Sequence, residues 1–230
     1  MPTVPIVTID GPSGSGKGTV SRLVADRVGW HLLDSGALYR LVALAGAQAG
    51  LGPQDAAGHS RLAMNMDVVF EIEPDGDERI LLAGKNVTTE VRSAAGGVGA
   101  SRVAVWPEVR TALLERQRAF AQLPGLVADG RDMGTVVFRD AALKVFLTAS
   151  AEARALRRYK QLKDKGSDVS LPALSREIAE RDLRDTTRAV APLMPASDAA
   201  IVDSTDLAIG AVVARVLALG ASRALWTIRE

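Results

Sequence analysis

The chain contains no cysteine and only two histidines, His31 and His59, among its 230 residues. A disulfide framework and thiolate metal sites are therefore excluded, and few ligands remain for zinc. Aromatic residues are also scarce, and 28 basic residues against 27 acidic ones leave a net charge of +1. Because nucleic-acid binding relies on basic fields and stacking platforms, we do not expect a nucleic-acid partner.

Long apolar runs are missing as well. The apolar stretch from Leu207 to Leu219 is too short to span a bilayer, and the N-terminus shows no basic flank followed by an apolar core. With 47% hydrophobic residues, a chain of this length can bury roughly 70–75% of its unfolded surface, in one large domain or a core with an inserted subdomain. The sequence predicts a cytoplasmic protein without a membrane partner and, since no coiled-coil seam is visible, a monomer.

A glycine-rich loop near the N-terminus is the strongest motif. It lies between Val4–Ile9, which has strand propensity, and Lys17–Val28, whose apolar residues recur at helical spacing. In this context, that of a P-loop, backbone N–H groups and the helix dipole bind phosphate, and Lys17 reaches the terminal phosphates of a nucleoside triphosphate. The alternative is a glycine turn that caps an ordinary helix. The loop residues expected at the nucleotide are Gly11, Pro12, Ser13, Gly14, Ser15, Gly16, Lys17, Gly18 and Thr19.

Gly18 stands where most P-loop proteins place the Ser or Thr that holds magnesium. Thr19 follows one residue later, so the loop ends Gly-Lys-Gly-Thr. This ending resembles nucleoside-monophosphate kinases more than GTPases or motor ATPases. A hydroxyl ligand for Mg²⁺ is therefore left unassigned.

Apolar runs alternate with amphipathic helical segments along the chain, which predicts an α/β fold with a parallel sheet flanked by helices. Core strands are expected at Val4–Ile9, His31–Leu33, Leu126–Ala128, Lys144–Leu147 and Ala200–Val202. Helices are expected at Lys17–Val28, Ala37–Ala49, Pro107–Leu123, Ala151–Lys165, Leu171–Arg184 and Asp206–Leu219.

The interval from about Asp67 to Asn86 breaks this alternation. Three short β-prone runs with a turn at Pro74–Asp77 predict a small antiparallel meander. We expect residues 60–104 to form an insertion, and residues 1–59 with 105–230 to form the P-loop core.

Two further segments are candidates for binding a second substrate. In His31–Arg40 a strand leads into a helix with Ser35 as its N-cap, so that Arg40 and backbone donors could meet a phosphate; the alternative is a capped helix with a solvated arginine.

In the second segment, an apolar strand places Asp129 at its carboxyl end, where parallel sheets bind ligands, and Arg131 and Asp132 follow. Asp129 is a candidate for holding Mg²⁺ or its waters. A loop ion pair between Arg131 and Asp132 is the alternative.

Two arginine-rich helices complete the set. Arg154, Arg157 and Arg158 begin a charged segment with a hinge at Gly166-Ser167, which we interpret as a lid of about residues 154–167 that closes over triphosphate. Helical spacing places most of a second group on one side of a helix, with an exposed salt-bridge ladder as the alternative. Its members are Arg181, Arg184, Asp185 and Arg188.

Together these motifs resemble the bacterial-type cytidylate kinase family over nearly the whole chain. The most specific block is Asp129-Gly130-Arg131-Asp132-Met133-Gly134-Thr135. The resemblance also rests on the Gly-Lys-Gly-Thr ending, Leu33-Asp34-Ser35-Gly36 with Tyr39-Arg40, and Arg181-Asp182 through Asp185 to Arg188-Ala189.

The resemblance implies ATP, with Mg²⁺, as phosphoryl donor and CMP or dCMP as acceptor, in pyrimidine nucleotide metabolism. It further implies that Arg40, Arg131 and Arg188 surround the acceptor phosphate, that Ser101, Arg110 and Asp132 read cytosine, that Arg181 and Asp185 contact the sugar, and that Ser35 and Tyr39 lie at the acceptor. Lys17, Arg131 and Arg188 would carry the catalysis. A kinase for UMP or dTMP is the nearest alternative. A nucleotide-dependent switch is less favoured, because no guanine-reading Asn-Lys-x-Asp is present.

Overall fold

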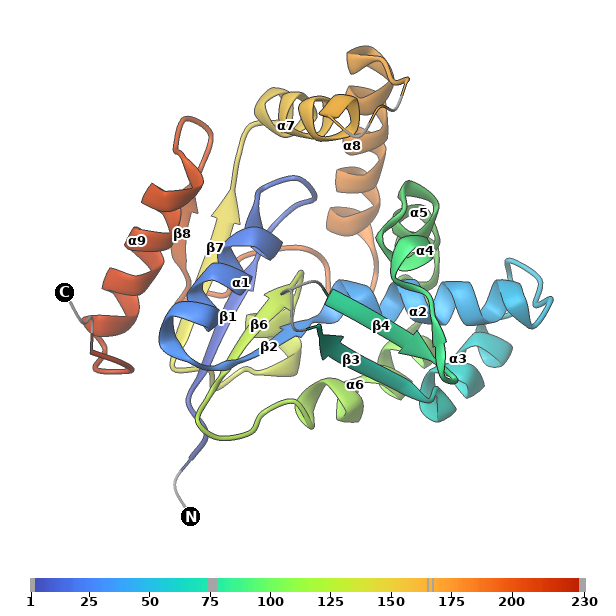
Figure 1. Cartoon of the computed structure of the whole chain (residues 1–230), viewed down its shortest axis with the longest axis horizontal. Helices are drawn as coiled ribbons and strands as arrows, with labels where there is room; N and C mark the ends of the chain where they lie inside the picture. Colours follow the sequence, from blue (N-terminus) through green and yellow to red (C-terminus); the bar gives the residue numbers. More distant parts are fainter. Residues whose placement is uncertain (1–2, 74–77, 165, 167, 228–230) are drawn as a thin grey trace. The chain divides into compact units, whose positions relative to one another are not determined.

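The computed structural model describes residues 3–73, 78–164, 166 and 168–227. The chain forms two compact units (Figure 1). The first unit comprises Met1–Asp34 and Arg118–Glu230, and the second comprises Ser35–Gln117. The turn expected at residues 74–77 and the hinge residue Ser167 lie outside the described residues. No helix in the described part is long and apolar enough to cross a membrane.

A five-stranded parallel sheet forms the centre of the first unit, in the order β2-β6-β1-β7-β8 (Figure 1). All strands expected from the sequence are present: β1 (Ile6–Asp10), β2 (His31–Asp34), β6 (Leu126–Gly130), β7 (Leu143–Thr148) and β8 (Ala200–Asp203). The expected parallel sheet is therefore confirmed. Because strand β1 is central, the loop that leaves its carboxyl end lies beside the ends of β6 and β7.

The helices of the first unit are α1 (Lys17–Val28), the single π-helical turn η1 (Met133–Val137), α7 (Ala151–Asp164), α8 (Leu171–Thr187) and α9 (Ile209–Ala221). Alternation along β1 divides its side chains between the two faces of the sheet. Val7 and Ile9 are fully buried in a core to which α1 and α9 contribute. Thr8 and Asp10 therefore belong to the other face, and η1 packs against β1 and β6.

The second unit is built around α2 (Ser35–Gln48), which packs against α3 (Ala56–Asn65), α4 (Thr88–Arg92) and α5 (Ala94–Val103). A three-stranded antiparallel sheet confirms the expected meander, with β3 (Val68–Ile72), β4 (Glu78–Leu82) and β5 (Lys85–Asn86). The last helix, α6 (Pro107–Arg118), belongs to this unit up to Gln117, after which the chain returns to the first unit. The predicted insertion, residues 60–104, lies within the span of the second unit.

Several boundaries differ from those expected. Helix α6 ends at Arg118 instead of Leu123, and residues 119–125 form the connection to β6. Helix α2 begins at Ser35, directly after β2, so Ser35 is its first residue and not an N-cap before Ala37. The sequence interpretation missed α3, α4 and α5. Helix α5 contains three glycines, which disfavour a helix in isolation, but packing against α2 stabilises it.

Candidate active site

The P-loop connects β1 to α1. Gly14 and Gly16 have φ angles of 78° and 89°, a left-handed conformation that glycine adopts without steric cost and that turns backbone N–H groups toward one point. The side chain of Ser15 is buried, and its hydroxyl has no hydrogen-bond partner among the described residues. The loop therefore has a phosphate-binding form at the positive end of a helix.

Lys17 is the first residue of α1, and its Nζ donates to the carbonyl oxygen of Pro12 at 3.3 Å. Burial lowers the pKa of Lys17, and the positive charge of Arg131 lowers it further, whereas Asp129 acts in the opposite direction. Charges at the end of β6 and in the loop after it thus reach this lysine. A cation in this place would gain strongly from a phosphate, which restores the favourable environment of the charged form.

Asp129 faces the start of α1 from the carboxyl end of β6. A Cβ built on Gly18 would lie 3.3 Å from Asp129 Oδ2, so a larger side chain at this position would crowd the carboxylate. Mg²⁺ usually takes one or two carboxylates together with phosphate oxygens. Among the described residues no three His, Cys, Asp or Glu side chains form a metal cluster. Asp129 therefore fits a magnesium ion that arrives with a nucleotide better than a site built from protein ligands alone.

Arginines and aspartates gather where the loop after β6 meets the end of α8. Arg131 Nε donates to Asp185 Oδ2 at 3.0 Å, and an Arg188 nitrogen lies 3.8 Å from an Asp132 oxygen. Burial by itself would raise the pKa of Asp185, but the charges of Arg131, Arg181 and Arg188 outweigh it and hold that pKa below its usual value. This cluster brings together five of the residues predicted to bind the acceptor.

Arg154 on α7 is buried and contacts both the P-loop and α8. Its guanidinium forms a two-pronged pair with Asp182, at 3.0 and 2.6 Å, and donates to the carbonyl oxygen of Ser13 at 3.1 Å. The arginine therefore joins α8 to the P-loop. Asp182 belongs to the Arg181-Asp182 motif, but no sequence pattern indicates that it pairs with Arg154.

The other two arginines of α7 differ from each other. Arg157 donates to the hydroxyl of Ser204 at 3.1 Å, and this hydroxyl lies 3.1 Å from the carbonyl oxygen of Ser15 in the P-loop. Arg158 instead donates to Gln161 one turn further along its own helix, at 2.8 Å. Ser204 was missed from the sequence because it follows a short strand and belongs to no recognisable motif.

In the second unit, Arg40 is held at the junction of α4 and α5. Its Nη1 donates to the carbonyl oxygens of Val91 at 2.7 Å and Ser93 at 3.1 Å. Both acceptors are neutral carbonyl oxygens, so these two bonds orient the guanidinium and add no negative charge of their own.

The remaining acceptor candidates of the second unit lie on α2, α5 and α6. The guanidinium carbon of Arg110 is 5.8 Å from the centre of the Tyr39 ring, within the range of a cation–π contact. Arg110 also donates to the carbonyl oxygen of Ala104 at 3.3 Å. Ser101 is buried on α5, and Ser35 is buried at the start of α2.

Comparison with known proteins decides the family. The family model described as cytidylate kinase matches residues 7–221. The chain belongs to the cytidylate kinase family. A cytidylate kinase of Stutzerimonas stutzeri is 58% identical, over 96% of this chain and 97% of that protein. Cytidylate kinases of Pseudomonas aeruginosa and Pseudomonas syringae pv. tomato are 58% and 60% identical, over 93% of this chain and 94% and 93% of their own lengths. The resemblance inferred from the motifs is thus confirmed.

One buried residue of this cytidylate kinase family member was not a candidate from the sequence. The Asp10 carboxylate accepts the backbone N–H groups of Met133 at 2.9 Å and Gly134 at 2.8 Å. Burial raises the pKa of Asp10 to about 7, although the two N–H groups favour the charged form; the negative charge of Asp132 adds to the rise. The sequence feature that could have identified Asp10 is its position immediately before Gly11 of the P-loop.

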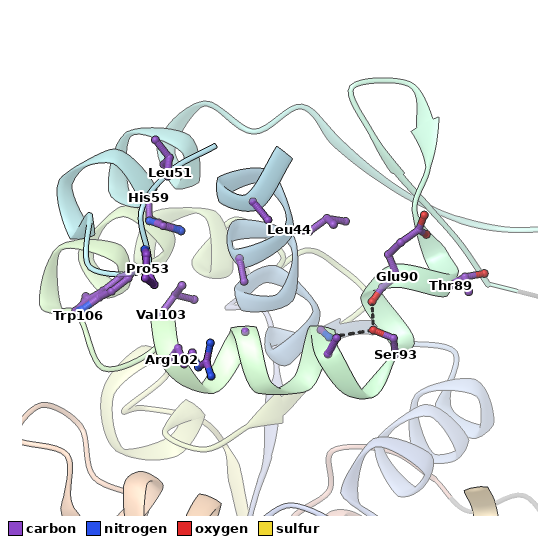
Figure 2. A pocket seen from close by; sticks show the side chains of 15 residues that line it. Leu44, Leu51, Pro53, His59, Thr89, Glu90, Ser93, Arg102, Val103 and Trp106 are labelled. Atoms are coloured by element: carbon purple, nitrogen blue, oxygen red, sulfur yellow. Dashed lines mark hydrogen bonds between the residues drawn. The ribbon is translucent and has the colours of Figure 1, made fainter. Parts of the chain in front are cut away.

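The second unit also contains a cavity of about 560 Å³, lined by parts of α2 and α5 together with residues near α3 and α4 (Figure 2). His59 and Trp106 lie toward one end of it, with ring centres 5.1 Å apart, and Thr89 and Glu90 lie toward the other. The lining is largely apolar and includes none of the residues predicted to bind nucleotide. The cavity is therefore distinct from the candidate acceptor residues of this unit.

Proposed function

We propose that this cytidylate kinase family member transfers the γ-phosphoryl group of ATP to CMP and dCMP, forming ADP with CDP or dCDP. Family membership supports the reaction. The cluster of Arg131, Asp132, Asp185 and Arg188 is the structural observation that carries it, because it combines groups for a phosphate with carboxylates for polar acceptor atoms. Within this cluster, the charge of Arg131 also acts on Lys17 of the P-loop.

For the donor, we propose that the loop from Gly11 to Thr19 binds the phosphates of ATP and that Lys17 compensates their charge. Asp129 would hold the accompanying Mg²⁺, directly or through its waters; bound there, the ion would neutralise charge on the phosphates. Arg154 and Arg157 already contact the loop through Ser13 and Ser204. With Arg158, they are proposed to act on triphosphate from a lid of about residues 154–167.

For the acceptor, we propose that Arg131 and Arg188, with Arg40, bind the monophosphate. The pairing of Arg131 with Asp185 supports this role, because a carboxylate at Nε orients the guanidinium while other N–H groups remain for phosphate. The remaining assignments are Asp132, Ser101 and Arg110 for the base, Arg181 and Asp185 for the sugar, and Ser35 and Tyr39 as further acceptor contacts.

Phosphoryl transfer requires little covalent help from the protein. Alignment of the two substrates, compensation of the charge on the transferred group and exclusion of water account for most of the catalysis. Lys17, Arg131 and Arg188 are the chain's own groups for that compensation, and no nucleophilic side chain is needed. We further propose a cytoplasmic monomer, and a role for residues 60–104 as the acceptor-binding insertion.

The test is ADP formation from ATP with a panel of monophosphates. We expect turnover with CMP and dCMP, weaker turnover with UMP, and little ADP when no acceptor is present. Phosphate release that does not depend on an acceptor would indicate a switch instead. Equal or better turnover with UMP or dTMP would move the assignment to another monophosphate kinase.

Base choice tests Asp132. Cytosine carries an amino donor where uracil carries a carbonyl acceptor, so a carboxylate favours cytosine and repels uracil. Replacing Asp132 with Asn should reduce the CMP over UMP ratio of kcat/KM by about 10–200-fold. Equal losses with both acceptors would contradict a base-reading role.

A further inference from the structure

The carboxylate of Asp10 connects the two loops on which the proposed reaction depends. Asp10 ends β1 and directly precedes Gly11 of the P-loop. Its two oxygens accept the N–H groups of Met133 and Gly134, at 2.9 and 2.8 Å, although these residues are 123 and 124 positions away. Both oxygens are engaged in buried hydrogen bonds. The start of η1 is thus fixed to the strand that carries the P-loop.

Gly134 makes this approach possible. A Cβ built on it would lie 2.8 Å from Thr8 Oγ1, too close for a real contact without a shift. Thr8 is on the same face of β1 as Asp10, two residues earlier. The segment after β6 therefore rests directly on this face of the strand, and its height above the sheet sets the length of both bonds to Asp10.

Asp132 is the residue immediately before the two N–H donors. Its side chain is buried, and an Arg188 nitrogen lies 3.8 Å from one of its oxygens. A displacement of Met133 would move Asp132 with it, because a single peptide bond separates them. We propose that Asp10 is a positioning residue that holds the segment after β6 so that Asp132 can distinguish cytosine from uracil.

The inference rests on the proposed function, since Asp132 has a base to read only if CMP is the acceptor. To the residues proposed to read the base, the inference adds Asp10, which would act through Asp132 without contacting the substrate. Discrimination between a donor and an acceptor on a base depends on hydrogen-bond geometry, which weakens steeply with misalignment. The carboxylate is suited to the task because it accepts two N–H groups at once. An amide offers one oxygen and would turn an NH₂ donor toward the second N–H group.

The experiment compares Asp10→Asn with the parent and with Thr8→Val. Thr8 is a matched control, because it is fully buried on the same strand face and its hydroxyl has no hydrogen-bond partner among the described residues. For Asp10→Asn we expect the CMP over UMP ratio of kcat/KM to fall at least about 10-fold, through a higher KM for CMP and an unchanged KM for ATP. Thermal unfolding of Asp10→Asn at the assay pH should remain a single cooperative transition, which shows that the variant is folded. Thr8→Val should keep the parental ratio.

Several outcomes would overturn the inference while leaving the proposed function intact. In the first, the parent prefers CMP and Asp132→Asn reduces that preference, but Asp10→Asn keeps the parental CMP over UMP ratio of kcat/KM. Another is a higher KM for ATP with an unchanged ratio, which would assign Asp10 to the P-loop alone. An equal fall in Thr8→Val would assign the effect to the strand face in general. A parent without CMP preference would overturn the base assignment and this inference together.

If Asp10→Asn does not fold, Gly134→Ala replaces it, because the added methyl lifts the segment while both carboxylates remain. The ratio should fall in Gly134→Ala and recover in the double variant Thr8→Ala/Gly134→Ala, in which the crowding hydroxyl is removed. A parental ratio in Gly134→Ala, or no recovery in the double variant, would contradict positioning by the Asp10 bonds.

Discussion

The two units of the molecule hold their proposed phosphate-binding arginines in different ways. In the first unit, Arg131 is paired with the carboxylate of Asp185 at 3.0 Å. In the second, Arg40 donates to the carbonyl oxygens of Val91 and Ser93. The first of these contacts orients an arginine by an opposite charge, and the other two do so by neutral dipoles.

This difference has an energetic consequence. Removing one member of a largely buried ion pair leaves an uncompensated charge, so the pair resists substitution even where it adds little net stability. Carbonyl oxygens impose a smaller penalty, and they leave the positive charge of the arginine able to attract an anion. The carboxylate of Asp185 thus opposes more of the charge of Arg131 than the two carbonyl bonds oppose at Arg40.

The largest effect is expected at Lys17, a cation of the first unit whose hydrogen bond goes to the neutral carbonyl of Pro12. Because its charge is proposed to act on phosphate, Lys17→Ala should lower kcat by about 10²–10⁴ with an unchanged melting temperature. Steady-state kinetics and thermal unfolding measure both. Lys85→Ala, which removes an exposed lysine on β5, is the control and should retain parental turnover. Near-parental turnover of Lys17→Ala would remove the P-loop lysine from the mechanism.

The second prediction concerns Asp10, a buried carboxylate whose hydrogen-bond partners are neutral, and the dependence of stability on pH. The partners of Asp10 are neutral N–H groups, and burial raises its pKa from 3.8 to about 7. The folded state therefore binds more protons than the unfolded state between about pH 4 and 7, and this group's contribution to the free energy of unfolding falls as pH rises through that interval. The parent should lose stability relative to Asp10→Asn by at most about 4 kcal/mol over this interval.

Urea unfolding of both proteins at a series of pH values, without nucleotide, measures this difference. Other groups titrate in both proteins, so the difference between the two isolates Asp10. A difference that does not change between pH 4 and 8, or one that changes in the opposite direction, would contradict a raised pKa.

The smallest expected effect tests the comparison directly. Arg131→Met should lower the free energy of unfolding by about 3 kcal/mol, since Asp185 would remain largely buried without this partner. For Arg40→Met, loss of the bonds to the neutral carbonyls of Val91 and Ser93 should cost about 1 kcal/mol. Urea unfolding at pH 7 measures both. Equal losses would mean that the kind of partner does not decide how strongly these arginines are held.

The meander and the helices around it show where sequence patterns succeed and fail. Residues 68–72 and 78–82 are short apolar runs that contain β-branched residues, and both form strands as expected. Helix α5 carries three glycines and was missed, because its helical state depends on packing against α2 and not on local propensity. Helix α1, whose apolar spacing is regular, was predicted with its observed bounds.

The sequence by itself determined the P-loop, the parallel strands and the cytidylate kinase family. These features are written in contiguous residues, through glycine positions, alternation and motif spacing. The tertiary structure alone decided the partners of the charged groups: Asp185 for Arg131, 54 positions away, and Gly134 for Asp10, 124 positions away. Local patterns fix strands but not their neighbours. Only the placement of β1 beside β6 brings the end of one strand to the loop that follows the other.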